Sequence, residues 1–298
     1  MFKNINAAAI GVSGHQSEII ELALTNGFQG MDIDIGEIAT RVRLHGAAYA
    51  KRLLASARLR LGVFALPLDL GCDDATFEKR LQKLSEYCQV AADVGCTRCV
   101  TAVSPASDQR PYHENFELHR RRLAEVCKVL APAGVRLGVG FCAAEYLRKG
   151  KAFQFIHDLD ALSLLVSMAG SSNLGLLLDV WEVFVAGGTV DAIRKLPVEQ
   201  IVAVDLANLA AGVSAADSNE DSRLLPGAED GAIDVGAVLA ALAQMGYTGP
   251  VTPKPSRNLL KNQRREAVVR EVGESLSRVW RAAGLAAPGR PIARSAAC

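Results

Sequence analysis

The chain has 298 residues, a length typical of one α/β barrel. Half of the residues are hydrophobic and 22% are charged, so the chain can bury a large core. Its 33 basic and 32 acidic residues leave a formal net charge of +1, which argues against nucleic acid or an anionic membrane as a partner, because both need a clustered basic excess. With no signal-peptide pattern and no run of about 18 apolar residues, we expect a cytoplasmic protein.

Short apolar or β-branched runs alternate with longer stretches along the chain. Several are almost wholly hydrophobic, which is typical of strands that are covered on both faces. In chain order we expect strands at Ala7–Val12, Gly30–Ile35, Leu61–Leu66, Arg98–Val103, Arg136–Phe141, Leu174–Asp179, Ile201–Leu206 and Pro250–Thr252.

The stretches between these runs carry apolar stripes at helical spacing. The clearest stripes cover residues 77–91, 116–130, 235–245 and 268–280. Eight β–α units in strict alternation predict a closed parallel (β/α)8 TIM barrel, built as a single domain over residues 1–283. An open doubly wound sheet is the alternative, but no G-x-G-x-x-G follows the first predicted strand. Residues 284–298 lack periodicity, and we expect them to form a loosely ordered tail.

One connection is unusually long and follows the seventh predicted strand. It covers residues 207–231, and loops of this length inside a compact domain are usually functional or disordered. Its place after a strand puts it on the C-terminal face of the barrel, where barrel active sites lie. We expect a lid or substrate-contacting loop, with a mobile surface loop as the alternative.

The seven cysteines are scattered, as expected for reduced thiols. Cys96 and Cys99 form a single C-x-x-C, and zinc would need a second pair. Ordinary, partly buried thiols are the main interpretation, and a redox role is the alternative.

Three segments of the second half resemble a known family: "NLGLLLDVWEVFVAGG", "LPVEQIVAVDLANLA" and "DSRLLPGAEDGAIDVGAVLAALAQMGYTGPVTPKPS". In order and spacing the chain resembles the xylose-isomerase-like sugar isomerases and epimerases from about Asn4 to Ala283. The resemblance implies a divalent metal at the barrel mouth, held by a Glu on the fifth strand, an Asp on the sixth, a His on the seventh and a Glu on the eighth. Such a metal would polarise a ketose carbonyl and its neighbouring hydroxyl.

The sequence departs from the family at these implied ligands. Gly140 stands in place of the first Glu, Asp205 in place of the His, and Lys254 in place of the second Glu, while Asp179 is kept. Glu182 occupies the position of a family His that touches substrate. We therefore expect no metal cofactor. A shifted Mn²⁺ or Mg²⁺ site at Asp179, Glu182 and Asp205 is the weaker alternative, which the positive charge of Lys254 opposes.

Charge arithmetic gives Lys254 a specific place in this pattern. Three carboxylates and a divalent ion sum to −1 in the implied family site, and Asp179, Asp205 and Lys254 also sum to −1. Lys254 can thus replace the metal electrostatically. Its other interpretations are a structural ion pair, a cation that polarises a substrate oxygen, and a Schiff-base lysine.

Three further residues are candidates for substrate binding. Arg223 lies in "DSRLLPG", where the resemblance implies contact with substrate oxygens, and a salt bridge that anchors the lid is the alternative. His15 follows the first predicted strand and His113 the fourth. Each can be a general acid or base, although a lone loop histidine is more often a polar, solvent-exposed side chain with no role in binding.

We therefore expect a sugar or polyol isomerase/epimerase-like protein without the family metal, with Asp179, Glu182, Asp205 and Lys254 as catalytic candidates. Its partner would be a small sugar, polyol or sugar phosphate, and it could form a homo-oligomer. The alternatives are a non-catalytic carbohydrate-binding or regulatory pseudoenzyme, or a lyase or dehydratase on the same scaffold. A related DNA-repair endonuclease does not fit, because the predicted mouth lacks the histidines of its multi-metal site.

Overall fold

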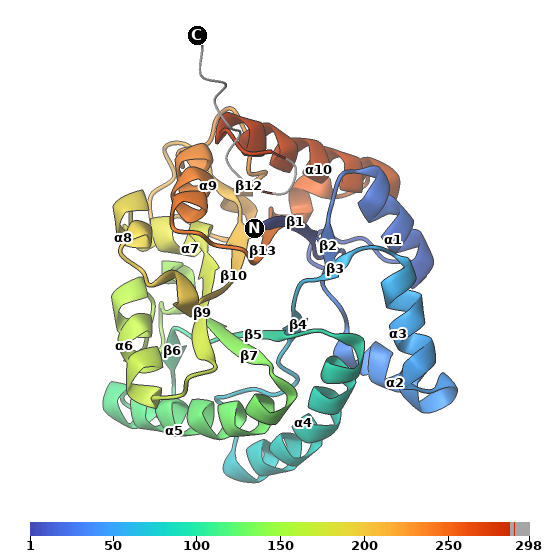
Figure 1. The fold of residues 1–298 in the computed structure, drawn as a ribbon. Helices are drawn as coiled ribbons and strands as arrows, with labels where there is room; N and C mark the ends of the chain where they lie inside the picture. The colour runs from blue at the N-terminus through green and yellow to red at the C-terminus, as the bar shows by residue number, and fades with distance from the viewer. Residues whose placement is uncertain (287–288, 290–298) are drawn as a thin grey trace.

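The computed structural model describes residues 1–286 and residue 289 of the chain. Nine parallel strands form one curved sheet in the order β3-β2-β1-β13-β10-β9-β7-β5-β4 (Figure 1). They are β1 (Phe2–Ile5), β2 (Gly30–Met31), β3 (Arg60–Leu61), β4 (Phe64–Ala65), β5 (Arg98–Ala102), β7 (Arg136–Gly140), β9 (Leu174–Asp179), β10 (Ile201–Leu206) and β13 (Pro250–Pro253).

The two ends of this sheet belong to one stretch of chain, and so the barrel closes. β3 pairs with β2, and β4 follows after two intervening residues and pairs with β5. Between them Asp32 accepts a hydrogen bond from the Val63 N–H at 2.9 Å, so a side chain rather than a strand takes this donor. β3 and β4 therefore form the third of eight units, and the predicted TIM barrel is confirmed.

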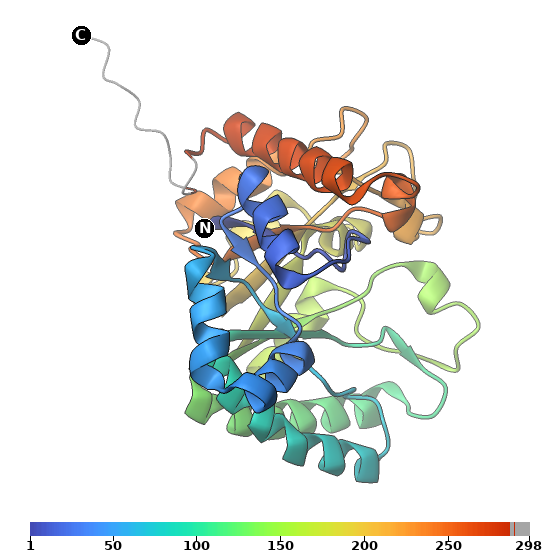
Figure 2. The same ribbon diagram turned by 90° about the vertical axis from the view of Figure 1, so that its right-hand side faces the viewer.

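Helices surround the barrel on its outside (Figures 1 and 2). The four predicted helical stripes lie on α4, α5, α9 and α10. In the described part of the chain no helix is long and apolar enough to cross a membrane. The helices are α1 (Gln16–Thr25), α2 (Ile35–His45), α3 (Ala47–Ser56), α4 (Asp74–Val94), α5 (Tyr112–Leu130), α6 (Leu159–Ala169), α7 (Val180–Val185), α8 (Val190–Arg194), α9 (Val235–Gln244) and α10 (Arg265–Ala282).

The prediction for the first strand was wrong. The strand is Phe2–Ile5, and the predicted run Ala7–Val12 is mostly turn. The Asn6 side chain accepts a hydrogen bond from the Ala9 N–H at 2.9 Å, and Gly11 has a φ of +74°. Both features break an extended conformation.

The long connection 207–231 has structure of its own. β11 (Asn208–Leu209) pairs antiparallel with β12 (Arg223–Leu224), and a 3₁₀ turn precedes β12 at Glu220–Ser222. A second small antiparallel pair joins β6 (Ala106–Ser107) to β8 (Phe153–Gln154).

The predicted tail begins at residue 284, and its first residues pack against the barrel. Leu285 is buried, and Trp280 Nε1 donates to the Ala286 carbonyl at 2.9 Å. The rest of the predicted tail, apart from residue 289, lies outside the described residues.

Candidate active site

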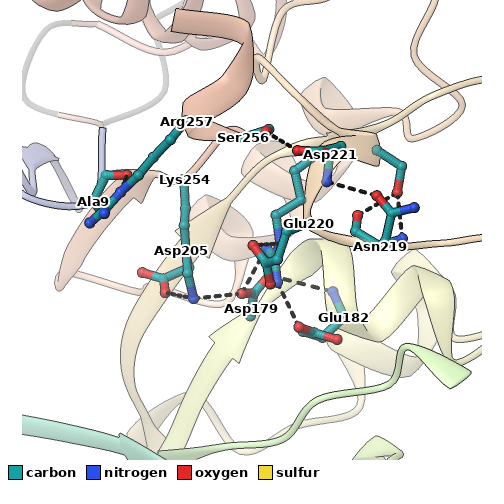
Figure 3. A network of polar contacts seen from close by, with 12 residues as sticks. Ala9, Asp179, Glu182, Asp205, Asn219, Glu220, Asp221, Lys254, Ser256 and Arg257 are labelled. Carbon is teal, nitrogen blue, oxygen red and sulfur yellow. Dashed lines mark hydrogen bonds and ion pairs between the residues drawn. The ribbon is translucent and has the colours of Figure 1, made fainter. Parts of the chain in front are cut away.

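Three strand ends bring together the residues that the sequence singled out. Asp179 ends β9, Asp205 lies on β10 opposite it, and Lys254 follows β13. The Lys254 ammonium lies 3.1 Å from an oxygen of Asp179 and 3.1 Å from an oxygen of Asp205 (Figure 3). Parallel strands aligned in register account for this convergence at the C-terminal mouth of the barrel.

The chain after β9 turns directly into α7 and places a second carboxylate beside the first. Asp179 is the N-cap of α7, and its Oδ1 accepts a hydrogen bond from the Glu182 N–H at 3.4 Å. The Glu182 carboxylate is buried and accepts a hydrogen bond from the Ala143 N–H at 2.6 Å. Helix α7 thus positions Glu182 within the charged cluster.

Arg223, at the start of β12, binds both of these carboxylates. Its Nη1 lies 3.1 and 3.0 Å from the two oxygens of Asp179, and its Nη2 lies 2.6 Å from Glu182 Oε1. Its guanidinium carbon lies 4.2 Å from the centre of the Trp181 ring, and its side chain is 1% exposed. These ion pairs match the alternative interpretation of Arg223 as an anchor for the long connection. Substrate contact by Arg223 stays a prediction.

The charges of this cluster compensate one another. Burial would lower the pKa of Lys254, but the carboxylates of Asp179 and Asp205 outweigh it and raise that pKa. Burial acts to raise the pKa of Asp179, yet Arg223 and Lys254 bring it down to about 2. Burial and the charge of Asp179 raise the pKa of Glu182 to about 7. Burial also raises the pKa of Asp205, against the pull of Lys254.

Lys254 keeps one donor for a ligand. Its ammonium has three N–H groups, and two of them point to Asp179 and Asp205. The side chain is 37% exposed, and the hydrogen bonds of the described residues leave the third N–H without a protein acceptor. On the facing strands Ala65 and Ala102 are also exposed, which leaves this part of the barrel end open.

A second polar cluster lies inside the barrel, and sequence reasoning missed it. Asn4 Nδ2 donates hydrogen bonds to Asp32 Oδ1 at 2.7 Å and to Thr252 Oγ1 at 2.9 Å. A side chain at Gly62 would clash with both Asn4 and Asp32, so glycine is needed there. The signal available in the sequence was Asp32 inside the predicted strand Gly30–Ile35, two residues after Gly30 on the same face.

The two histidine candidates lie on the expected side of the barrel but outside both clusters. His15 precedes α1 and is exposed, and its backbone N–H donates to Glu18 Oε2 at 3.0 Å. His113 lies in the first turn of α5 with an 81% exposed side chain, 3.9 Å from Glu114. Their roles in substrate binding stay predictions.

The side chains at the mouth do not fit a divalent metal. Gly140, at the end of β7, offers no ligand, and both oxygens of Asp179 already bind Arg223. The Lys254 ammonium lies between the two aspartates that would coordinate the ion. Among the described residues, no group of three or more His, Cys, Asp or Glu side chains is arranged to hold a metal ion.

Comparison with known proteins gives a family and a sequence relative. Residues 20–278 match the model of the family described as xylose isomerase-like TIM barrel. A 3-dehydroshikimate dehydratase of Pseudomonas aeruginosa strain PAO1 is 26% identical over 250 residues. The match covers 82% of this chain and 37% of that relative, so the chain spans well under half of the relative's length.

Two solved structures show the same fold. A xylose isomerase domain protein of Alicyclobacillus acidocaldarius has a TM-score of 0.84 and 24% identity, over 95% of this chain and 99% of that one. D-psicose 3-epimerase of Clostridium cellulolyticum H10, solved with D-tagatose, has a TM-score of 0.70 and 15% identity, over 95% of this chain and 99% of that one. At these identities the likeness concerns the fold.

Proposed function

Because the chain belongs to the xylose isomerase-like TIM barrel family, we propose that it moves a proton between neighbouring carbons of a small sugar or polyol-type carbonyl compound. The substrate binds at the C-terminal mouth of the barrel, and the reaction needs no divalent metal. The observation that carries this proposal is the Lys254 ammonium, held 3.1 Å from both Asp179 and Asp205 with one N–H left over.

Lys254 supplies a fixed positive charge to the reaction. Its third N–H donates to the substrate carbonyl oxygen, where negative charge develops when the neighbouring carbon loses its proton. Asp179 and Asp205 raise the pKa of Lys254 and hold the ammonium in place. An amine kept protonated in this way does not form a Schiff base, which requires the neutral form.

Arg223 and Glu182 give this cation a rigid support. Arg223 binds both oxygens of Asp179, so the carboxylate cannot rotate away from Lys254. Arg223 and Asp179 are both buried. Because Arg223 belongs to β12, which pairs with β11, this ion pair joins the long connection to the site. In this proposal the connection acts as a substrate-contacting loop anchored by Arg223.

Loss of water is the second candidate reaction. The relative that is 26% identical is a 3-dehydroshikimate dehydratase. Dehydration of a β-hydroxy ketone also begins with removal of a proton next to the carbonyl, and so it needs the same cation at the carbonyl oxygen. The two reactions differ only in whether the proton returns to carbon or a hydroxyl leaves as water.

Hydrogen exchange in D₂O tests the common first step. The protein, dialysed against a chelator, is incubated with D-psicose, D-tagatose or 3-dehydroshikimate, and deuterium next to the carbonyl is measured by NMR. Mass spectrometry of the same samples detects loss of water. We expect exchange with at least one compound in the presence of the chelator, and its loss in Lys254→Met.

Lys261→Met is the matched control, because Lys261 is an exposed lysine of the same strand-to-helix connection whose only polar contact in the described structure is made by its backbone N–H, which the substitution keeps. It should exchange at the wild-type rate. Exchange that requires added Mn²⁺ or Mg²⁺ would contradict the metal-free proposal. Absence of exchange with all three compounds would contradict catalysis and favour the pseudoenzyme. In that case, calorimetry with the same compounds would detect whether the pocket still binds them.

A further inference from the structure

The acidic side chains at the barrel mouth fall into two kinds. Asp179, Glu182 and Asp205 each contact a cation, either Arg223 or Lys254. Asp179 contacts both cations, which lower its pKa to about 2 and make it a weak proton acceptor. Glu182 and Asp205 have raised pKa values, but their carboxylates are engaged in ion pairs with Arg223 and Lys254. Asp32, in contrast, accepts hydrogen bonds from an amide and a backbone N–H, both neutral.

The strand register places Asp32 at the level of the site. Asn4 pairs with Gly30, and Thr252 pairs with Asp205, which in turn pairs with Asp179. The hydrogen bond from Asn4 to Thr252 joins these strands into one layer of the barrel interior.

Two positions lie one step above this layer on the same strand faces. Asp32 lies two residues beyond Gly30, and Lys254 lies two residues beyond Thr252. Each lies one residue past the end of its strand, β2 or β13. The hydrogen bond of Asp32 with Asn4 and those of Lys254 with Asp179 and Asp205 show that both side chains face the barrel interior. The Asp32 carboxylate and the Lys254 ammonium thus approach the barrel interior from different strands at a similar height.

The Asn4 side chain is positioned to donate a hydrogen bond to the Asp32 carboxylate. It is fully buried, and its Nδ2 donates hydrogen bonds to Asp32 at 2.7 Å and to Thr252 at 2.9 Å. Its Oδ1 is buried with no hydrogen-bond partner in the described structure. An orphaned buried acceptor destabilises the fold, so its presence points to a demand other than stability. Gly62, with no side chain, provides the space for this pair.

We propose that Asp32 is a catalytic residue that accepts the proton from the carbon next to the carbonyl bound by Lys254. This inference rests on the proposed function. The C–H bond breaks, a bond forms between that proton and an Asp32 oxygen, and the C–H electron pair moves to form an enolate whose oxygen faces the ammonium. For isomerisation, the proton then passes to the former carbonyl carbon, while the neighbouring hydroxyl gives its proton to the enolate oxygen and becomes the new carbonyl. For dehydration, the proton leaves with a departing hydroxyl as water.

The electrostatics of Asp32 agree with this role. Burial, with a smaller contribution from the Asp205 carboxylate, raises the pKa of Asp32 to about 7 against the opposing effect of hydrogen bonds from Asn4, Val63 and Asn6. Asp205 is the charged group that acts on it in the described structure, and the hydrogen-bond donors are neutral. A base of this strength matches proton abstraction near neutral pH.

The test compares Asp32→Asn with Asp34→Asn by deuterium exchange into D-psicose, D-tagatose and 3-dehydroshikimate. Asp34 is exposed and caps α2 through its side chain, a role that Asn can also fill. We expect Asp32→Asn to lose exchange by about 100-fold or more while calorimetry shows retained binding, and Asp34→Asn to match wild type. The wild-type exchange rate should rise through about pH 7.

A second variant separates catalysis from structure. Asp32→Ala with added formate should recover part of the exchange, because formate can replace the missing carboxylate, whereas Lys254→Met with formate should not. Wild-type exchange rates in Asp32→Asn, together with lost exchange in Lys254→Met, would overturn the role of Asp32 and leave the proposed function standing. If wild-type protein exchanges none of the three compounds, both proposals fail.

Discussion

The two halves of the barrel mouth hold their carboxylates in different ways. On β9, β10 and β13, Asp179 and Asp205 share the ammonium of Lys254, and Arg223 binds Asp179 from the other side. Beside β1 and β2, Asp32 accepts hydrogen bonds from Asn4 and from a backbone N–H, and among the described residues no cation forms an ion pair with it. One residue type therefore occupies two electrostatic environments within one site.

The contrast shows how surroundings assign roles to identical groups. Burial acts to raise the pKa of both aspartates, but Arg223 and Lys254 bring the pKa of Asp179 down to about 2, whereas the pKa of Asp32 rises to about 7. The first stays charged and holds a cation, and the second can exchange a proton near neutral pH. Separated pKa values are the usual basis for dividing acid–base roles within an active site.

The largest expected effect on stability comes from breaking the ion pairs of the charged half of the mouth, which is formed by Asp179, Glu182, Asp205, Arg223 and Lys254. Arg223→Met leaves the buried carboxylates of Asp179 and Glu182 without their shared partner. Removing one member of a buried ion pair typically costs about 3–5 kcal/mol, so the free energy of unfolding in urea should fall by roughly that amount. Arg194→Met is the control, because the ion pair of Arg194 with Asp191 is 47% exposed on the arginine side and should contribute less than about 1 kcal/mol. Equal losses in both variants would contradict the buried network.

A smaller change in the free energy of unfolding, of opposite sign, is expected from Asp32. It belongs to the neutral half of the mouth, where neutral donors rather than cations bind the carboxylate. The unfolded carboxyl of Asp32 releases its proton near pH 4, while the folded one, with its pKa raised to about 7, keeps it. Between about pH 4 and pH 7 the unfolded state therefore binds fewer protons, and the stability contributed by Asp32 is lost as pH rises. Asp32→Asn removes this loss, so it should be more stable than wild type above about pH 7, by at most about 4 kcal/mol.

This gap should narrow as the pH falls toward about 4, where Asp32 is protonated in both states. Urea denaturation of the two proteins across this range measures it, with Asp34→Asn as the control that should follow wild type. A constant difference at every pH would mean that Asp32 keeps an ordinary pKa, and the contrast between the two halves would lose its basis.

The charged half was largely predictable from the sequence. Strands Leu174–Asp179 and Ile201–Leu206 match the predicted bounds, because strands buried on both faces have continuous apolar runs with clear ends. Register then aligns their terminal aspartates. The binding of Arg223 to Asp179 and Glu182 was not predictable, because it depends on how the long connection folds back as a hairpin.

The neutral half was missed for a physical reason. β1 contains Lys3 and the buried Asn4, so it lacks the apolar pattern of a strand, while the apolar run 7–12 forms turns. Asp32 and Asp34 look alike in "GMDIDI", and both follow β2, which ends at Met31. Only the start of α2 at Ile35 makes Asp34 the helix cap and leaves Asp32 as the carboxylate bound to Asn4. Pattern alone does not separate a polar barrel interior from a loop.

The metal content of the wild-type protein tests most directly whether Lys254 replaces a divalent ion. Its positive control is the triple variant Gly140→Glu, Asp205→His and Lys254→Glu, which restores the family ligands. A Cβ at position 140 would lie 3.3 Å from Leu177 Cδ2, so a small shift of Leu177 accommodates it. The variant should bind Mn²⁺ in calorimetry.

Freshly purified wild-type protein is dialysed against metal-free buffer and analysed for Mg²⁺, Mn²⁺ and Zn²⁺ by mass spectrometry. Since the Lys254 ammonium lies between Asp179 and Asp205, we predict no stoichiometric divalent ion. One ion per chain that survives dialysis, and is lost when Asp179 or Asp205 is changed to Asn, would contradict the account.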